Sequence, residues 1–225
     1  SSSPWFLCDL IECNMKQTSH RSIERLSMYR RLLSAAKSAG QTSVYSHNLA
    51  EMSGCTAAQI RRDLMQVGCA GNPKTGYPID GLIEQIGLFL DNPAGEPIAL
   101  IGVGNLGRAL LHFYSAHHPK LKIVAAFDTD PYKTGRVIHG CHCYDMGDAQ
   151  DIIAKMNINV ALLAIPADAA QSVAERLLDA GISGLLNFAP KHLQLPSKVT
   201  VEDMDMTMAL EKTAFLARQA SQSLK

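Results

Sequence analysis

A glycine-rich segment in the middle of the chain constrains the fold more than any other feature. Pro97 to Ile101 predicts a buried strand, and Gly102-Val103-Gly104-Asn105-Leu106-Gly107 follows it directly. A helix through about Ser115 comes next, and then a strand at 122–127 that ends in Asp128. A strand, a GxGxxG turn, a helix, a strand and an acidic residue in this order are typical of a dinucleotide-binding unit. The second half of the chain is therefore predicted to fold as a Rossmann-type parallel sheet.

The residues of this turn have distinct expected tasks. Gly102 permits the tight turn, Gly104 lets the backbone approach a diphosphate, and Gly107 lets the helix pack closely on the strand. The diphosphate would lie at the helix N-terminus, where free N–H groups and the helix dipole favour an anion. The Asp128 carboxylate can accept both hydroxyls of an adenosine ribose and would repel a 2′-phosphate, so we expect NAD(H) rather than NADP(H). The alternative is a strand-end carboxylate without a ligand.

The parallel pattern continues with a strand at residues 160–165, a helix at 167–180 and a strand at 184–188. Ligands of open parallel sheets bind at the carboxyl ends of strands, so the segments after these strands should line the nicotinamide side. The residues expected to bind the cofactor are Gly102, Val103, Gly104, Asn105, Leu106, Gly107, Asp128, Thr129, Lys133, Ile165, Pro166, Asn187, Phe188 and Ala189.

The second half offers little for catalysis. A dehydrogenase needs a general acid or base and a pocket for its substrate. The segment from Asn187 to the C-terminus is too short for a substrate domain, and His192 is its only histidine. We therefore expect a protein that is not an enzyme. There are two alternatives. One is a small NAD-dependent oxidoreductase, and the other is a nucleotide- or CoA-binding module without a DNA role.

Charge divides the chain unevenly although the formal net charge is +0. Between Lys16 and Lys74 nine Lys and Arg stand against three acidic residues, whereas 14 acidic residues stand against 12 basic ones from Asp91 onward. This asymmetry is typical of a basic nucleic-acid module joined to a neutral one, and a solvated basic face is the alternative. The segment 91–97 clusters two prolines and a glycine, which indicates a linker between the halves.

The first half has the pattern of short helices. One helix carries an apolar stripe from Ile23 to Ala36 and ends at Gly40, and a second one starts at Ser46, turns Leu49 and Met52 inward and closes at Gly54. A third begins with Thr56-Ala57-Ala58-Gln59, a capping box. Two helices joined by a tight turn, the second with paired arginines, indicate a helix-turn-helix.

The third helix has the features of a recognition helix. Ile60, Leu64 and Val67 repeat at helical spacing and should face the core, which leaves Arg61 and Arg62 outside. Residues 68–79 suit a β-hairpin wing, and Asp80 is expected to cap a fourth helix that ends near Leu90. The residues expected to contact DNA are Thr56, Ala58, Gln59, Arg61, Arg62 and Lys74.

Several other classes are disfavoured. The six cysteines are not needed as disulfide staples in a chain with its own apolar core, so we expect free thiols. The segment Cys141-His142-Cys143 lacks a second ligand pair at zinc spacing, and no metal is expected. Since no apolar run approaches the roughly 20 residues of a membrane span, and the N-terminus lacks the pattern of a signal peptide, we expect a cytoplasmic protein.

Four motifs point to a known family. They are Ile101 to Leu110, Phe127 to Gly135 (FDTDPYKTG), Ile165 to Gln171 (IPADAAQ) and Leu186 to Pro190 (LNFAP), and Ala58 to Leu64 (AQIRRDL) is similar to the same family's recognition helix. Together they resemble the bacterial redox-sensing transcriptional repressors called Rex, over about residues 22–220. The resemblance implies a homodimer with winged-helix DNA-binding domains, Rossmann NAD(H) domains and a C-terminal helix exchanged between protomers. It also implies binding to an inverted-repeat operator upstream of fermentation and respiratory genes, and release by NADH.

The resemblance also implies a switch and a domain plan. Arg31 and Asp205 match a pair that the family joins across the dimer in its DNA-bound state, and Phe113 falls where the family has a tyrosine. Departures are Gln66-Val67-Gly68 in place of an aromatic pair before the wing glycine, an unusual wing at 72–76, and Met206 in place of an aromatic residue. The predicted parts are an N-terminal extension (1–20), a winged-helix domain (21–90), a linker (91–97), a Rossmann domain (98–204) and a swapped helix (205–225).

Overall fold

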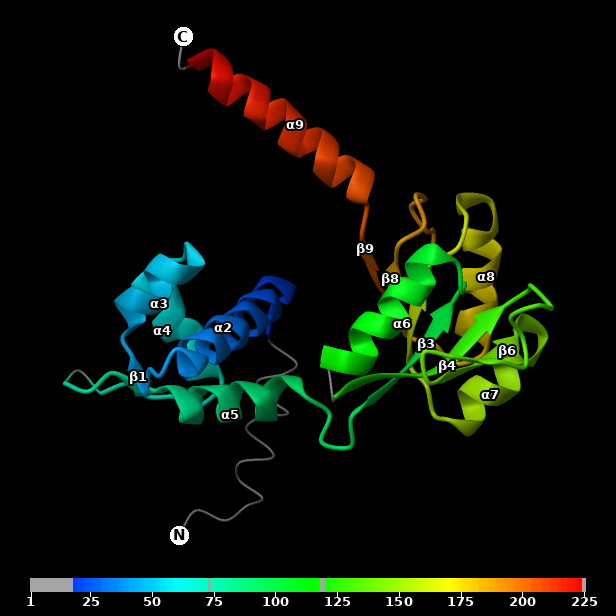
Figure 1. Cartoon of the computed structure of the whole chain (residues 1–225). Coiled ribbons are helices and arrows are strands. Elements are labelled where there is room, and N and C mark those ends of the chain that lie inside the picture. The colour runs from blue at the N-terminus through cyan, green and yellow to red at the C-terminus, as the bar shows by residue number, and fades with distance from the viewer. Residues whose placement is uncertain (1–17, 73, 118–119, 224–225) are drawn as a thin grey trace. The chain divides into compact units, whose positions relative to one another are not determined.

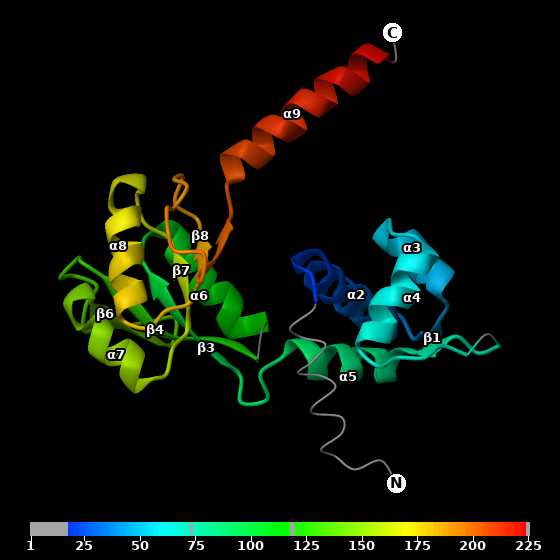
Figure 2. The same ribbon diagram turned by 180° about the vertical axis from the view of Figure 1, so that it is seen from behind.

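The computed structural model describes residues 18–72, 74–117 and 120–223, so most of the predicted extension at 1–20 lies outside the described residues. Contacts divide the chain into two compact units, Ser1–Pro93 and Ala94–Lys225. Figures 1 and 2 show a helical first unit and a second unit built on a sheet. The predicted α/β class, with a winged helix followed by a Rossmann-type domain, is confirmed.

The first unit is a small helical domain with a two-stranded wing. Its elements are α2 (His20–Ser38), β1 (Ser43–Val44), α3 (Ser46–Ser53), α4 (Ala57–Gln66), β2 (Tyr77–Pro78) and α5 (Ile79–Leu90). The strands β1 and β2 pair antiparallel, and Asn72 bridges to Gly76 nearer the tip of the wing. Leu26, Tyr29, Leu33, Leu49 and Ile60 are fully buried in one apolar core. Gly54 ends α3 in the left-handed conformation, at a φ of 69°, and so sets the tight turn into α4.

Three details of this unit differ from the sequence prediction. Ile23 and Met52 are 41% and 43% exposed, because α2 and α3 each bury a narrower stripe than their apolar residues suggest. Asp80 does not cap α5, since the Ile79 N–H bonds to the Thr42 carbonyl at the end of the wing pairing and α5 begins there. Asp80 lies in the first turn of α5 instead, where its Oδ1 forms a salt bridge with Lys37 Nζ at 2.7 Å.

The second unit is a seven-stranded sheet in the order β5-β6-β4-β3-β7-β8-β9. All neighbouring strands are parallel except β5 and β6, which form an antiparallel hairpin. The strands are β3 (Glu96–Ile101), β4 (Leu121–Asp128), β5 (Val137–Ile138), β6 (Cys141–Asp145), β7 (Val160–Leu163), β8 (Gly184–Asn187) and β9 (Thr200–Asp203). The helices are α6 (Asn105–His117), α7 (Ala149–Lys155), α8 (Ala167–Asp179) and α9 (Met206–Ser223), with a 3-10 turn at Met146–Asp148.

Helices cover both faces of this sheet. The α6 side is packed by Leu100, Val103 and Leu111, and the opposite side by residues of α7 and α8 such as Ile153 and Leu177. Figure 1 shows α6 on one side of the strands and α8 on the other. Strand order reverses at β3, which pairs with β4 on one side and β7 on the other. A crevice at the carboxyl ends of these strands is the usual place for a ligand in such a sheet.

Candidate cofactor site and DNA-binding surface

The glycine turn after β3 is held from two neighbouring strand ends. The N–H of Gly102 donates to the carbonyl of Phe127 at 2.8 Å, and the N–H of Ala164 donates to the carbonyl of Ile101 at 2.8 Å. Gly102 has a φ of 92°, and a side chain there would meet the Ala164 carbonyl. A side chain at Gly107 would collide with the Gly102 carbonyl oxygen. Glycine is therefore required at both positions by the protein itself.

Gly104 differs from the other two glycines of the motif. Its φ is not positive, and a Cβ atom built on it meets nothing within 4 Å. Neither backbone conformation nor a protein neighbour explains a glycine here. It lies one residue before α6 begins at Asn105, where free helix N–H groups attract anions. The open space above Gly104 fits a ligand diphosphate that approaches the backbone closely.

Asp128 at the end of β4 is tied to the turn rather than free. Its Oδ2 accepts from the Val103 N–H at 2.8 Å and from Lys133 Nζ at 3.1 Å, and its Oδ1 accepts from the Asp130 N–H at 2.9 Å. Burial alone would raise the pKa of Asp128, but these hydrogen bonds outweigh it and the net pKa is lowered. The carboxylate is therefore ionised and keeps lone pairs for further donors, which is what a ribose diol needs. The strand-end Thr129 is exposed beside it.

The predicted nicotinamide side is organised by Asn187, which is 1% exposed. Its Oδ1 accepts from the Ala189 N–H at 3.0 Å, and its Nδ2 donates to the Lys191 carbonyl and to Asp203 Oδ1, each at 2.8 Å. Asp203 also accepts from His192 Nδ1 at 2.9 Å. These hydrogen bonds assign Asn187 to shaping the turn after β8. The half-buried Ile165 and Phe188 supply the apolar lining, whereas Pro166 is exposed.

The predicted recognition helix α4 contains a buried acidic residue that the sequence analysis missed. Asp63 is 1% exposed and accepts from Arg25 Nε at 2.6 Å, Arg25 Nη2 at 2.7 Å, the Tyr29 hydroxyl at 3.0 Å and Gln59 Nε2 at 2.8 Å. Burial would raise the pKa of Asp63, yet these donors lower it overall. No periodic signal marks such a residue, because its partner Arg25 is 38 positions away.

This network corrects the predicted capping box. The Thr56 side chain does accept from the Gln59 N–H at 3.2 Å, but the Gln59 amide donates to Asp63 instead of returning to Thr56. A hydrogen bond stabilises the fold more when it satisfies a buried carboxylate than when it satisfies the exposed N–H groups of a helix N-terminus, because water can replace the partner only at the exposed site. Gln59 is therefore engaged inside the domain, which limits its freedom to contact DNA.

The remaining predicted DNA contacts lie on the outer surface of the first unit. Ala58, Arg61, Arg62 and Lys74 are exposed, and Arg61 Nη1 donates to Ser46 Oγ at 3.1 Å. The Lys74 N–H donates to Asn72 Oδ1 at 2.8 Å within the wing. Arginines on an exposed helix face and a lysine on a wing are groups that read bases and neutralise phosphates.

The predicted switch residues fall in different units, so their pairing stays a prediction. Arg31 is exposed on α2, and Asp205 lies before α9, where its Oδ1 accepts from the Met208 N–H at 2.9 Å and so caps that helix. Phe113 on α6 is 48% exposed and packs edge-on against Tyr114.

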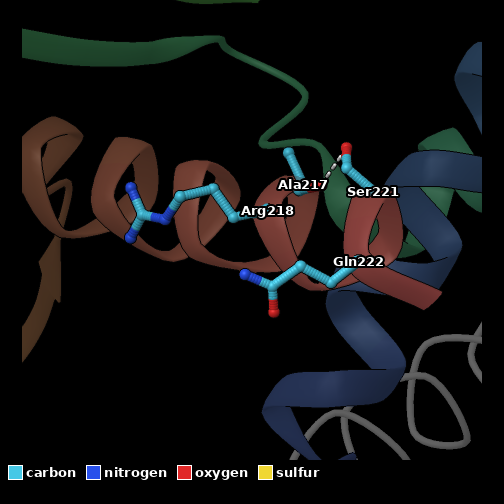
Figure 3. Close-up of a pocket in the computed structure, with 4 residues that line it drawn as sticks. All are labelled: Ala217, Arg218, Ser221 and Gln222. Carbon is cyan, nitrogen blue, oxygen red and sulfur yellow. Dashed lines mark hydrogen bonds between the residues drawn. The ribbon is translucent and has the colours of Figure 1, made fainter. Parts of the chain in front are cut away.

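The C-terminal helix α9 does not pack on its own domain. Met206, Met208, Leu210, Phe215 and Leu216 are each more than half exposed. Figure 3 shows its C-terminal part, with the side chains of Ala217, Arg218, Ser221 and Gln222, where the Ser221 hydroxyl donates to the Ala217 carbonyl at 3.0 Å. An apolar helix surface of this extent indicates a contact with another protein surface.

The described residues include four cysteines. Cys55, Cys69, Cys141 and Cys143 are free thiols, and burial, with a smaller effect of Cys143, raises the pKa of Cys141 to about 11. In the described parts of the chain, no three His, Cys, Asp or Glu side chains gather where they could hold a metal ion. None of the described helices is long and apolar enough to span a membrane.

Together these features define a winged-helix protein with a dinucleotide-type Rossmann domain. A family model described as "CoA binding domain" matches residues 95–191, and one described as "Putative DNA-binding protein N-terminus" matches residues 17–64. The chain is 37% identical over 188 residues to a redox-sensing transcriptional repressor Rex of Listeria welshimeri, covering 84% of this chain and 87% of that one. It is 36% identical over 199 residues to the Rex of Rhodopirellula baltica, covering 88% and 84%. The chain belongs to the Rex family of redox-sensing transcriptional repressors.

Solved structures of a Rex-family repressor, RSP, have the same fold. The crystal structure of RSP in complex with β-NAD⁺ and operator DNA matches with a TM-score of 0.82 and 30% identity, covering 91% of this chain and 94% of that one. The complex of RSP with β-NADH matches with a TM-score of 0.79 and 30% identity, covering 92% and 99%.

Proposed function

We propose that this protein is a transcriptional repressor that binds operator DNA through its winged-helix unit and senses NAD(H) through its Rossmann unit. The observation that carries the proposal is that two features occur in the same chain. One is an exposed arginine pair on α4, and the other is a glycine turn in which Gly104 leaves room for a ligand. RSP, a family member of the same fold, was solved with operator DNA and with either form of the cofactor. Since the curated relatives are named repressors, we infer that it works without catalysis, in the cytoplasm where operator DNA is available.

A selection and titration experiment tests this function. Duplexes that bind the full chain are selected from a randomised pool and measured by fluorescence anisotropy, with and without NADH or NAD⁺. We expect an inverted repeat whose half-sites lie one helical turn or a multiple apart, and release by NADH. Failure to enrich any duplex, or enriched duplexes that NADH leaves bound, would contradict the proposal.

We assign Arg61 and Arg62 to base and phosphate contacts. Replacing a base-reading arginine with alanine should cost roughly 1–3 kcal/mol and relax the sequence preference, whereas losing a phosphate contact weakens all sequences alike. Lys37→Ala removes a charge elsewhere in the same unit and is the control. Near-normal operator binding by the double alanine variant would refute the assignment.

We assign Asp128 to the adenosine ribose of NAD(H). Asp128→Asn keeps the shape of the residue but removes the charge that repels a 2′-phosphate, so the preference for NADH over NADPH should narrow. Because Asp128 also accepts from the Val103 N–H, thermal melting must show that the variant is folded. Equal affinities of the unmodified protein for NADH and NADPH would refute this role.

We propose that NADH binds more tightly than NAD⁺ and favours a different arrangement of a homodimer. Burying the positive nicotinamide ring of NAD⁺ against Ile165 and Phe188 is unfavourable without a partner, and only differential affinity can shift a conformational equilibrium. In this dimer α9 is exchanged between protomers, which covers its exposed apolar side chains. Arg31 of one protomer then pairs with the partner's Asp205 in the DNA-bound state.

The pairing of Arg31 and Asp205 has its own test. Asp205→Ala also removes the cap of α9, so Asp205→Asn is the sharper variant, since asparagine caps a helix about as well. We expect Asp205→Asn to weaken operator binding and spare NADH binding. Full operator affinity together with full release by NADH would place the coupling elsewhere.

A further inference from the structure

The wing of the first unit, defined as strand β1 together with residues 68–72 and 74–78, has few backbone contacts of its own. Its strands β1 and β2 are two residues each, and beyond them Asn72 and Gly76 exchange two backbone hydrogen bonds at 3.1 and 2.8 Å. A hairpin held by so few bonds is marginal in isolation. At its tip the Lys74 N–H also donates to Asn72 Oδ1 at 2.8 Å, which leaves the Lys74 carbonyl for a contact from outside the hairpin.

Tyr45 supplies two contacts to this wing. The residue lies between β1 and α3, and its hydroxyl donates to the Lys74 carbonyl at 2.8 Å. Its ring edge lies beside Gly76, where a Cβ atom would come within 3.3 Å of Tyr45 Cδ1 and 2.6 Å of the Val44 carbonyl oxygen. Its other ring contact is a stack on His47, with centroids 5.4 Å apart and planes 19° apart.

The residue after Tyr45 contacts Arg61, another of the cations assigned to DNA binding. Ser46 Oγ accepts from Arg61 Nη1 at 3.1 Å, so two consecutive residues contact the wing tip and the recognition helix. Tyr45 is 37% exposed and does not belong to the apolar core of the unit. The junction between β1 and α3 therefore holds Lys74 and Arg61 in a fixed relation within one unit.

We propose that Tyr45 is a positioning residue for DNA binding, which orders the wing so that Lys74 meets the DNA backbone while α4 occupies the groove. The inference rests on the proposed function and adds to it a residue outside the recognition helix. Its physical basis is pre-organisation: a loop that is already ordered loses less conformational entropy on binding. Its partner is the phosphate backbone, since Lys74 lies on the wing outside the recognition helix and its ammonium is a point charge that suits a phosphate.

The test uses the full chain and the selected operator duplex, with Tyr45→Phe, Lys74→Ala and the double variant titrated over a series of salt concentrations. Tyr45→Phe removes one hydrogen bond and keeps the ring, so we expect roughly 2- to 10-fold weaker binding. Lys74→Ala should reduce the salt slope by about 0.9 for the lost phosphate contact. If Tyr45 acts through Lys74, the double variant should bind much like Lys74→Ala alone.

Controls separate positioning from general damage. Tyr132→Phe makes the same chemical change at a tyrosine of the other unit that is 79% exposed, and it should leave operator affinity unchanged. Amide exchange without DNA should become faster at Gly76 in Tyr45→Phe, while NADH titrations stay unchanged. Wild-type affinity and salt slope in Tyr45→Phe, or full additivity with Lys74→Ala, would overturn the inference. An unmodified protein that binds no duplex would instead overturn the proposed function.

Discussion

The buried ion pair of the first unit gives the sharpest stability prediction, and the change is Arg25→Ala. Arg25 gives Asp63 two short hydrogen bonds, and its side chain is 21% exposed while that of Asp63 is 1% exposed. Removing Arg25 leaves a carboxylate that is buried in the domain with only the Tyr29 and Gln59 donors. The variant tests how far the fold of the DNA-binding unit depends on one charge pair.

The expected cost follows from burial. Breaking a buried pair by removing one partner costs about 3–5 kcal/mol, and the partial exposure of Arg25 places this variant near 3 kcal/mol. An exposed pair costs about 0–1 kcal/mol. Lys37→Ala, on the same helix, breaks the exposed Lys37–Asp80 pair, whose side chains are 58% and 75% exposed, and is the matched control.

The pH dependence has a defined sign. In the unmodified protein the pKa of Asp63 is lowered, so its contribution to stability is fully present above the unfolded pKa of about 3.9 and is lost as the pH falls below it. In Arg25→Ala, burial still raises the pKa of Asp63, while the Arg25 guanidinium that opposed this effect most strongly is gone. Protonation then relieves the buried charge, and the penalty of the variant should shrink as the pH falls.

Hydrogen exchange followed by mass spectrometry measures the effect segment by segment in the full chain. Amides of α2 and α4 should exchange about 100-fold faster in Arg25→Ala, since each 1.4 kcal/mol is a factor of ten. Peptides from β3 and β7 are the internal reference and should not change. If Arg25→Ala behaves like Lys37→Ala, or if its penalty grows as the pH falls, the reasoning from burial is wrong.

Three further predictions concern the second unit. Gly104→Ala should leave the melting temperature unchanged but weaken NADH binding at least 10-fold, whereas Gly107→Ala should lower both, because only Gly107 would collide with protein backbone; equal behaviour of the two variants in melting would contradict this. Asp205→Ala should cost α9 about 1 kcal/mol and expose the Met208 amide to exchange, while Asp205→Asn should not; the same exchange rate in both would exclude the cap. Asn187→Ala leaves the buried Ala189 N–H without its acceptor and should cost about 1–3 kcal/mol in urea unfolding, with weaker NADH binding; an unchanged midpoint would show that the turn after β8 holds by itself.

Local sequence patterns predicted those parts of the molecule whose physics is local. The glycine spacing at 102–107 requires a tight turn and close helix packing, and the structure has both. The helices α3 and α4 follow from apolar spacing and from Gly54, whose left-handed conformation needs no distant partner. The strands β6 and β9 were missed, because their mixed residues CHCYD and TVED become strands only by pairing with β4 and β8.

The sequence alone determined the class of each unit, the nucleotide-type turn and the exposed arginine pair, because each depends on residues within a few turns of backbone. Only the tertiary structure decided the roles of Asp63, Asn187 and Tyr45. Their hydrogen-bond partners include Arg25, Asp203 and Lys74, at separations of 38, 16 and 29 positions. The role of a polar side chain that is buried or that holds a loop depends on its hydrogen-bond partner, and folding is what brings that partner close.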